Sequence, residues 1–252
     1  MAEPNAQPPS PIAGPPSDTG QEIDHEHPDV SGGWLRPAVF GAMDGLVSNF
    51  ALIAGVVGGT KGDHSSQVVL AGLAGLAAGA FSMAAGEYTS VASQAEYTER
   101  EIEVERLEIL ANSGAEQAEL AQMYVDRGID RDLAEKVAEQ VHSDPELAVE
   151  VHAREELGVD PDNLPSPVVA AVSSFFAFAV GASLPVLPYL LGASAIWPAL
   201  IISLVALFAC GAVVSRITTR TWWYGGIRQM VLGGVAAAIT YFIGDLVGAT
   251  LG

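Results

Sequence analysis

The sequence contains very little of two kinds of residue, cysteine and the basic residues. Cys210 is the single cysteine among 252 residues, which excludes an internal disulfide and any zinc site built from cysteines. It lies in an apolar stretch, where we expect it to be a small core residue. Lysine and arginine together number 11 against 30 acidic residues, which gives a formal net charge of −19. Nucleic acid is not among the partners that we expect for this chain.

The first 30 residues lack large apolar side chains almost completely. Seven of the fifteen prolines lie in this stretch, which predicts a disordered N-terminal tail over residues 1–30. No basic segment precedes an apolar one, so we expect no cleavable signal peptide. The run Asp24-His25-Glu26-His27 carries metal-ligating side chains, although a solvated tail is the simpler interpretation.

The charged residues are segregated along the chain rather than spread over it. Residues 93–163 hold 20 of the 30 acidic and 6 of the 11 basic residues, while half of all residues are hydrophobic. The flanking stretches run apolar for about 20 residues each, the length that an α-helix needs to cross a bilayer. Backbone groups in lipid must satisfy their own hydrogen bonds, which favours helices. We expect spans at residues 35–57, 68–91, 167 to about 185–188, 198–215 and 226–247.

The predicted fold is therefore an all-α membrane protein with five transmembrane helices. Residues 31–92 form the first two spans and residues 166–252 the last three. An acidic helical domain, residues 93–165, is inserted between the second and the third helix. Short loops at 58–67 and 190–197 predict that neighbouring spans run antiparallel.

The few basic residues predict the orientation in the bilayer. If the N-terminus is cytoplasmic, the six basic residues of the insert and four others lie on the cytoplasmic side, and one lies outside. Loops that face the cytoplasm carry the excess of lysine and arginine. The four are Arg36, Arg216, Arg220 and Arg228, and the outer one is Lys61.

Three polar or sulfur-containing side chains in the first two spans are candidates for an ion pathway. A carboxylate near the bilayer centre costs on the order of 2.5–3.5 kcal/mol, so Asp44, well inside the first span, is expected to face a pathway or a partner. Glu87 lies near the inner end of the second span, where an interfacial position is the alternative. Met83 shares its helix face, one turn earlier, although a lone methionine is commonly a packing residue. Carboxylates with a thioether favour Fe²⁺ or a similar transition ion over Mg²⁺ and Ca²⁺.

Acidic residues recur at helical spacing in the insert. A first helix is predicted to continue the second span to about residue 109, with a break at Asn112-Ser113-Gly114. Further helices are expected over 115–127, 130–142 and from Pro145 to about 157. Like charges one turn apart destabilise a helix unless cations neutralise them, and carboxylates with one imidazole suit Fe²⁺, Mn²⁺ or Zn²⁺. The candidate ligands are Glu101, Glu105, Glu108, Glu116, Glu119, His152 and Glu156, although any single one of these glutamates could be a solvated surface residue.

Four short stretches of the chain resemble the vacuolar iron transporter family. They are FGAMDGLVS at residues 40–48, GAFSMAAGEY at 79–88, SQAEYTE at 93–99 and EELG at 155–158. The similarity runs from about Trp34 to the C-terminus. Bacterial members of this family are single five-helix proteins.

The resemblance implies a homodimer with a translocation path between the protomers. It also implies a three-helix cytoplasmic metal-binding domain and proton-coupled export of Fe²⁺ from the cytosol. By this resemblance Asp44 and Met83 hold the ion in the membrane, with Glu87 at the cytoplasmic end of the path. The implied ligands of the cytoplasmic domain are Glu105, Glu108, Glu116, Glu119 and Glu156. Some members have methionine and glutamate where this chain has His152 and Ala153, a departure that bears on metal preference.

We therefore expect a transporter, not an enzyme, that exports Fe²⁺ or Mn²⁺ through a lipid bilayer by proton antiport. Zn²⁺ and Co²⁺ also fit such a mixed ligand set. A divalent-cation channel without proton coupling, or a membrane-anchored metal buffer or sensor, is the alternative. An oxidase is disfavoured because the insert lacks the paired Glu-x-x-His helices of di-iron bundles. With no organellar targeting signal, the expected location is the plasma (inner) membrane of a bacterial-type cell.

Overall fold

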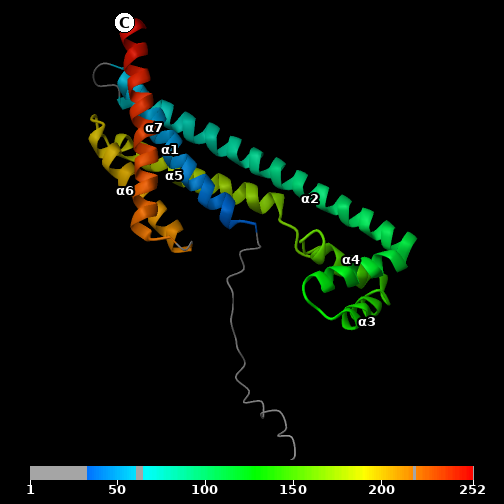
Figure 1. Ribbon diagram of the computed structural model, residues 1–252. Helices are drawn as coiled ribbons and strands as arrows, with labels where there is room; N and C mark the ends of the chain where they lie inside the picture. Colours follow the sequence, from blue (N-terminus) through cyan, green and yellow to red (C-terminus); the bar gives the residue numbers. More distant parts are fainter. Residues whose placement is uncertain (1–32, 61–64, 218–219, 252) are drawn as a thin grey trace, which may run out of the picture.

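A computed structural model describes residues 33–60, 65–217 and 220–251, and within these ranges the regular structure is helical throughout. The predicted tail, the run of residues 24–27 and Lys61 lie outside the described residues. The helices, shown in Figure 1, are α1 (Leu35–Gly59), α2 (Ser65–Asp126), α3 (Arg131–Val141), α4 (Pro145–Glu155), α5 (Pro167–Leu190), α6 (Trp197–Ile217) and α7 (Trp222–Leu251).

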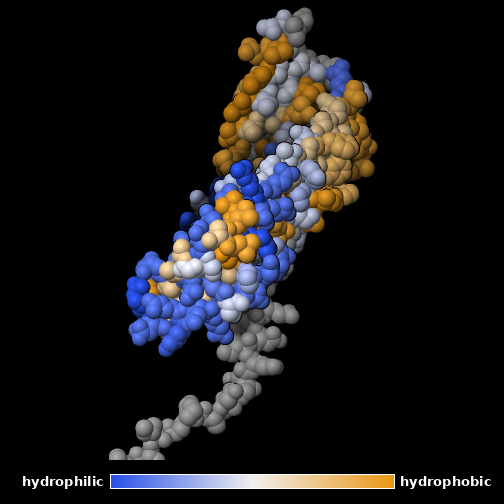
Figure 2. Space-filling model, turned by 90° about the vertical axis from the view of Figure 1, so that its right-hand side faces the viewer, coloured by the Kyte–Doolittle hydropathy of each residue, from blue (hydrophilic) through white to orange (hydrophobic). Residues whose placement is uncertain are grey.

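Five of these helices, α1, α2, α5, α6 and α7, are long and apolar enough to cross a membrane. Many of their large apolar side chains point outward, among them Leu70, Phe176 and Phe242, which are 72%, 63% and 69% exposed. Figure 2 shows the resulting division, with hydrophobic residues over the helical bundle and mostly hydrophilic residues over the domain that projects from it. The predicted all-α membrane fold is confirmed.

Helix α2 links the bundle to the projecting domain. A rise of 1.5 Å per residue makes its stretch from Ser65 to Asn112 about 70 Å long, more than twice the bilayer core. At Asn112 the backbone leaves the helical region, with φ −137° and ψ 40°, and the chain turns back sharply (Figure 1). This confirms the helix break that the sequence predicted at Asn112-Ser113-Gly114.

Helices α3 and α4 pack against α2 on both sides of its Asn112 break, around two small apolar cores. One contains Ile109, Ala148 and Val149, and the other contains Leu120, Ala121 and Ala138. Both short helices begin at aspartate caps. The side chains of Asp130 and Asp144 accept hydrogen bonds from the backbone N–H groups of Asp132 and Glu146, which satisfies donors that a helix start leaves free.

In the bundle, α1 packs against α2, α5, α6 and α7. Its contact with α5 is backbone to backbone, because glycines on both helices leave no side chain between them. A Cβ atom added at Gly45 would lie 2.3 Å from the carbonyl oxygen of Phe178, and one added at Gly181 would lie 2.2 Å from that of Ala42. This close approach fixes the rotation of α1 at Asp44, the residue before Gly45.

The predicted end of the third span was wrong by a few residues. Helix α5 continues through Pro185 and Pro188 to Leu190. A proline in a helix removes one hydrogen bond, and membrane helices tolerate this where neighbouring groups satisfy the freed carbonyl oxygen. Both prolines are buried within the helix, and Pro188 lies in its last turn. The fifth span likewise begins earlier than predicted, at Trp222 instead of residue 226.

Candidate metal sites

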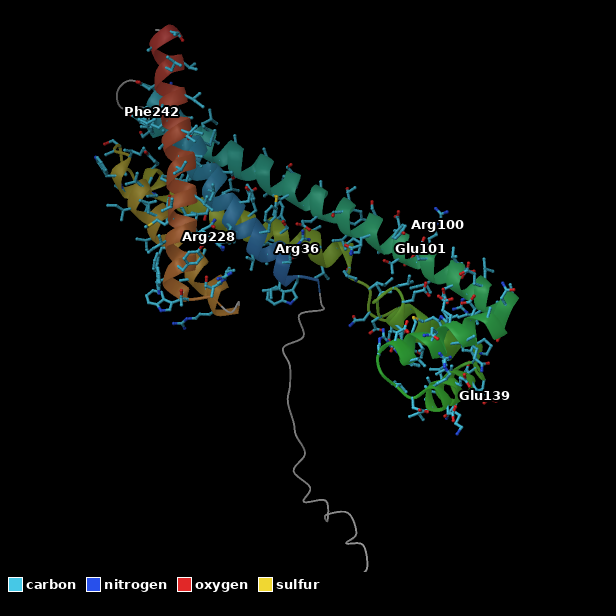
Figure 3. The ribbon with its side chains drawn as sticks, viewed as in Figure 1. Arg36, Arg100, Glu101, Glu139, Arg228 and Phe242 are labelled. Carbon is cyan, nitrogen blue, oxygen red and sulfur yellow. The ribbon has the colours of Figure 1, made fainter. Side chains whose placement is uncertain are left out.

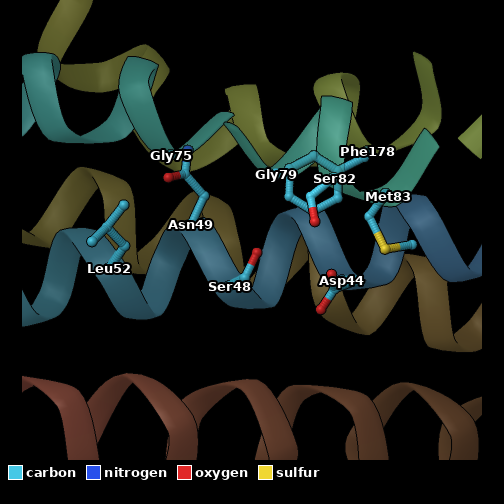
Figure 4. Close-up of a pocket in the computed structure, with 9 residues that line it drawn as sticks. All are labelled: Asp44, Ser48, Asn49, Leu52, Gly75, Gly79, Ser82, Met83 and Phe178. Atoms are coloured by element: carbon cyan, nitrogen blue, oxygen red, sulfur yellow. The ribbon is translucent and has the colours of Figure 1, made fainter. Parts of the chain in front are cut away.

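A cavity of about 310 Å³ lies in the membrane part, where α1 faces α2 (Figure 4). Most of its polar groups come from one face of α1, and α2 contributes small residues that leave the space open. Phe178 from α5 closes one side. The lining residues are Asp44, Ser48, Asn49, Leu52, Gly75, Gly79, Ser82, Met83 and Phe178.

Two of the three predicted pathway residues line this cavity together. Asp44 on α1 and Met83 on α2 are both half-buried, and both line the cavity from the two facing helices (Figure 4). A carboxylate and a thioether thus share one space between membrane helices. Glu87 lies one turn beyond Met83 and is 9% exposed. It is not among the lining residues of the cavity, and its burial favours an inward position over an interfacial one.

Asn49 is a lining residue to which the sequence analysis gave no role. Its Nδ2 donates hydrogen bonds to the carbonyl oxygens of Gly72 on α2 and Ala182 on α5, at 3.1 and 2.6 Å. Because only the amide nitrogen can donate, these bonds fix the orientation of the amide group. Its Oδ1 is buried and has no hydrogen-bond partner in the part of the chain that the structure describes. A Cβ atom at Gly75 would lie 2.9 Å from this oxygen, so the glycine leaves room for it.

The second site lies in the projecting domain, where α4 crosses α2. Glu105 of α2 and His152 of α4 are buried, Glu156 follows the end of α4, and one ligand atom from each lies within 4.8 Å of the others. His152 Nδ1 is 2.8 Å from Glu105 Oε1. The two side chains are 0% and 7% exposed. The sequence predicted all three residues as ligands, and the fold brings them together from two elements.

The carboxylates around this site repel one another. Burial, and then the negative charges of Glu156, Glu116, Glu108 and Glu119, raise the pKa of Glu105 to about 7. Burial and the neighbouring carboxylates also raise the pKa of Glu116 and of Glu156. Five of the predicted glutamates therefore form one electrostatic group that a cation would stabilise. Glu101 lies one turn before Glu105 and is half-buried, and its role stays a prediction.

His152 is neutral at physiological pH. Burial, and to a lesser degree the nearby His142, lowers the pKa of His152 to about 4. Its contact with Glu105 is therefore not an ion pair, and a neutral imidazole keeps a lone pair that can bind a metal ion. Carboxylate oxygens with an imidazole nitrogen suit Fe²⁺, Mn²⁺, Co²⁺ or Zn²⁺.

His142, at the end of α3, is the second residue that the sequence analysis missed. Its Nε2 is 3.1 Å from Nε2 of His152. The two residues are ten positions apart on different helices, so helical spacing gives no signal of the contact. The Pro145 turn between α3 and α4 was visible in the sequence, but not which side chains it would bring face to face.

Comparison with known proteins gives one consistent result. The sequence pattern of the VIT family matches residues 35–245. "Vacuolar iron transporter" of Acanthamoeba castellanii is 36% identical over 222 residues, which are 85% of this chain and 78% of that protein. "Vacuolar iron transporter 1" of Oryza sativa is 30% identical over 86% of this chain and 88% of its own length. The protein of the same name from Arabidopsis thaliana is 30% identical over 89% and 91%.

Proposed function

The chain belongs to the VIT family, and on that premise we propose that it exports Fe²⁺ from the cytosol across a membrane in exchange for protons. The family and the transporter relatives make it a multi-pass membrane iron transporter rather than an enzyme. The direction of transport, the proton coupling and the residues that carry them are our inference from the two sites.

The observation that carries this proposal is the carboxylate of Asp44 opposite Met83 in a cavity between membrane helices. A carboxylate at that depth is costly unless it serves a pathway. The soft thioether favours Fe²⁺ over Mg²⁺ and Ca²⁺. Oδ1 of Asn49, which has no hydrogen-bond partner among the described residues, can add a neutral oxygen ligand. Mn²⁺, Co²⁺ and Zn²⁺ fit the same ligand types and are the competing cargoes.

The proposed route passes through two metal sites, one in the projecting domain and one in the membrane part. The cytoplasmic cluster of Glu105, His152 and Glu156, with Glu108, Glu116 and Glu119 around it, collects the ion. Glu101 lies one turn before Glu105 on α2. The ion then passes the buried Glu87 and reaches Asp44 and Met83. Asp44 gives up its proton when the cation arrives and regains one when the cation leaves, which links the two fluxes.

The proposed orientation has the N-terminus and the acidic domain in the cytoplasm. Arg36 at the start of α1 and Arg228 in the first half of α7 lie on the side of the bundle from which α2 projects, and Phe242 lies toward the other end (Figure 3). Trp34 and Trp222, 51% and 52% exposed, mark the same boundary, as expected for interfacial aromatic residues. The membrane that we propose is the plasma (inner) membrane of a bacterial-type cell.

We also propose that the working unit is a homodimer. Ser48 and Ser82 line the cavity and are exposed at the side of the bundle, and Asp44 is only half-buried. A second copy that covers this side would keep the carboxylate away from hydrocarbon, where an exposed charge is expensive.

Metal accumulation in proteoliposomes tests the transport role. We expect the purified protein to accumulate Fe²⁺ in vesicles with an acidic lumen, and Asp44→Ala to abolish this. Asp245→Ala is the matched control, because Asp245 is an exposed aspartate of α7 away from the cavity. Wild-type protein that binds Fe²⁺ but accumulates none would instead indicate a metal buffer or sensor. Accumulation that ignores the pH gradient would indicate a channel.

A further inference from the structure

Two histidines from different helices face each other beside the cytoplasmic cluster. His142 follows α3 and is half-buried, and His152 lies in α4 and is fully buried. Their Nε2 atoms are 3.1 Å apart, and the rings meet edge to face with centroids 5.2 Å apart. Two neutral imidazoles at this distance share one proton between these nitrogens, so one ring donates and the other accepts.

His152 has a different neighbour on each ring nitrogen. Nδ1 lies 2.8 Å from Glu105 Oε1, and Nε2 lies against His142. Both Nδ1 and that carboxylate oxygen are buried and make no well-formed hydrogen bond with any described residue. A neutral imidazole carries a proton on one nitrogen and a lone pair on the other. A metal ion at the cluster can bind His152 through Nδ1 only if the proton is on Nε2.

We propose that His142 is a positioning residue that holds His152 in its metal-binding tautomer. The Nε2–H group of His152 donates to Nε2 of His142, and the lone pair is then on Nδ1, the nitrogen that lies 2.8 Å from Glu105 Oε1. This inference rests on the proposed function of the cluster as a metal site. The partner of the second nitrogen commonly sets the tautomer and ring orientation of a metal-bound histidine.

The consequence is a nitrogen ligand with a fixed direction in a site otherwise made of carboxylates. Carboxylates alone attract divalent cations of many kinds, whereas imidazole favours transition ions. Losing such a partner typically weakens metal binding by about 10–100-fold. His142 therefore contributes to metal selectivity without touching the ion.

Two substitutions of His142 distinguish a role in positioning His152 from a role in packing against it. His142→Phe keeps an aromatic ring against His152 but offers no acceptor, and His142→Gln offers an amide oxygen but no ring. We would measure Co²⁺ affinity of the detergent-solubilised full chain by competition with a chromophoric chelator. We expect the Phe variant to lose about 10–100-fold in affinity and the Gln variant to stay within a few-fold of wild type. Ser143→Ala, next to His142 but exposed, is the control.

The other outcomes would overturn the inference. Full affinity in His142→Phe would mean that the ring only packs, and an equal large loss in both variants would mean that His142 binds the ion itself. Thermal unfolding of each variant checks that the domain is folded. The residues of the N-terminal run 24–27 are present in every variant, so their contribution cancels. Wild-type affinity that is unchanged in Glu105→Gln would show that the cluster is not a metal site, which would overturn the site and this inference together.

Discussion

At the scale of single residues, the raised pKa of Glu105 has a measurable consequence. Its carboxyl group has a pKa of about 7, and its proton must leave before a cation binds there. His152, with a pKa of about 4, adds no competing proton between pH 6 and 8. We therefore expect Co²⁺ affinity to fall by up to about tenfold per pH unit as the pH drops below 7, and to level off above it.

Chelator competition between pH 6 and 8 measures this dependence. Glu105→Gln should bind Co²⁺ more weakly, and its affinity should depend less on pH because the proton of Glu105 no longer competes with the metal ion. Among the neighbouring glutamates, Glu116 and Glu156, whose pKa values are also raised, would still compete. A wild-type affinity that stays constant over this range would contradict the account of the cluster.

The sequence predicted some residues of the sites and missed others for a physical reason. Asp44 stood out as a carboxylate inside an apolar span, and Met83 because it lies one turn from Glu87 on the same helix face. The structure shows that Asp44 and Met83 line one cavity. Asn49 and His142 were missed because their roles depend on contacts with residues that are distant in the sequence. Asn49 bonds to residues 23 and 133 positions away, and helical periodicity carries no information about such contacts.

At the scale of the helices, glycines decide how closely α1 and α5 approach. Gly45→Ala should strongly destabilise the bundle, because its Cβ would lie 2.3 Å from a backbone oxygen that cannot move aside easily. Gly234→Ala on α7 is the matched control, since the nearest atom there is a leucine methyl group at 3.7 Å. Thermal unfolding in detergent compares the two. Equal melting temperatures would contradict the close packing of α1 on α5.

Element boundaries were predictable where side chains act locally. The break in α2 followed from Asn112-Ser113-Gly114, and aspartates before α3 and α4 cap those helices. The end of α5 was missed because Pro185 and Pro188 are helix breakers in water but are tolerated in a packed membrane helix. Tertiary packing overrides the local signal there.

At the scale of the whole molecule, the proposed homodimer predicts which face is covered. In a Cys210→Ala background, Ser82→Cys should form a cross-link between two copies in the membrane when oxidised or bridged by a short reagent. Val205→Cys on α6, which is 63% exposed, should not. Electrophoresis under non-reducing conditions measures the amount of cross-linked dimer. Equal cross-linking of both variants, or of neither, would contradict a dimer face at the α1–α2 cavity.

The five-span architecture could be predicted from hydropathy alone, since lipid requires long apolar helices. The orientation of the chain rests on few charges, and Lys61, the one basic residue expected outside, lies beyond the described residues. Hydropathy does not predict that α2 extends well beyond the bundle, that the chain reverses at Asn112, or that the acidic domain projects from the bundle. That arrangement depends on contacts between α2, α3 and α4.

Proton-coupled transport through Asp44 is tested most directly by following Fe²⁺ and protons together in proteoliposomes with an acidic lumen. We expect Fe²⁺ accumulation with proton release in the wild type and no transport in Asp44→Ala. Asp44→Asn keeps an oxygen ligand but cannot exchange a proton, so it should pass Fe²⁺ down its gradient without moving protons. Proton-coupled accumulation that survives in either variant would contradict the role of Asp44 and, with it, the proposed mechanism.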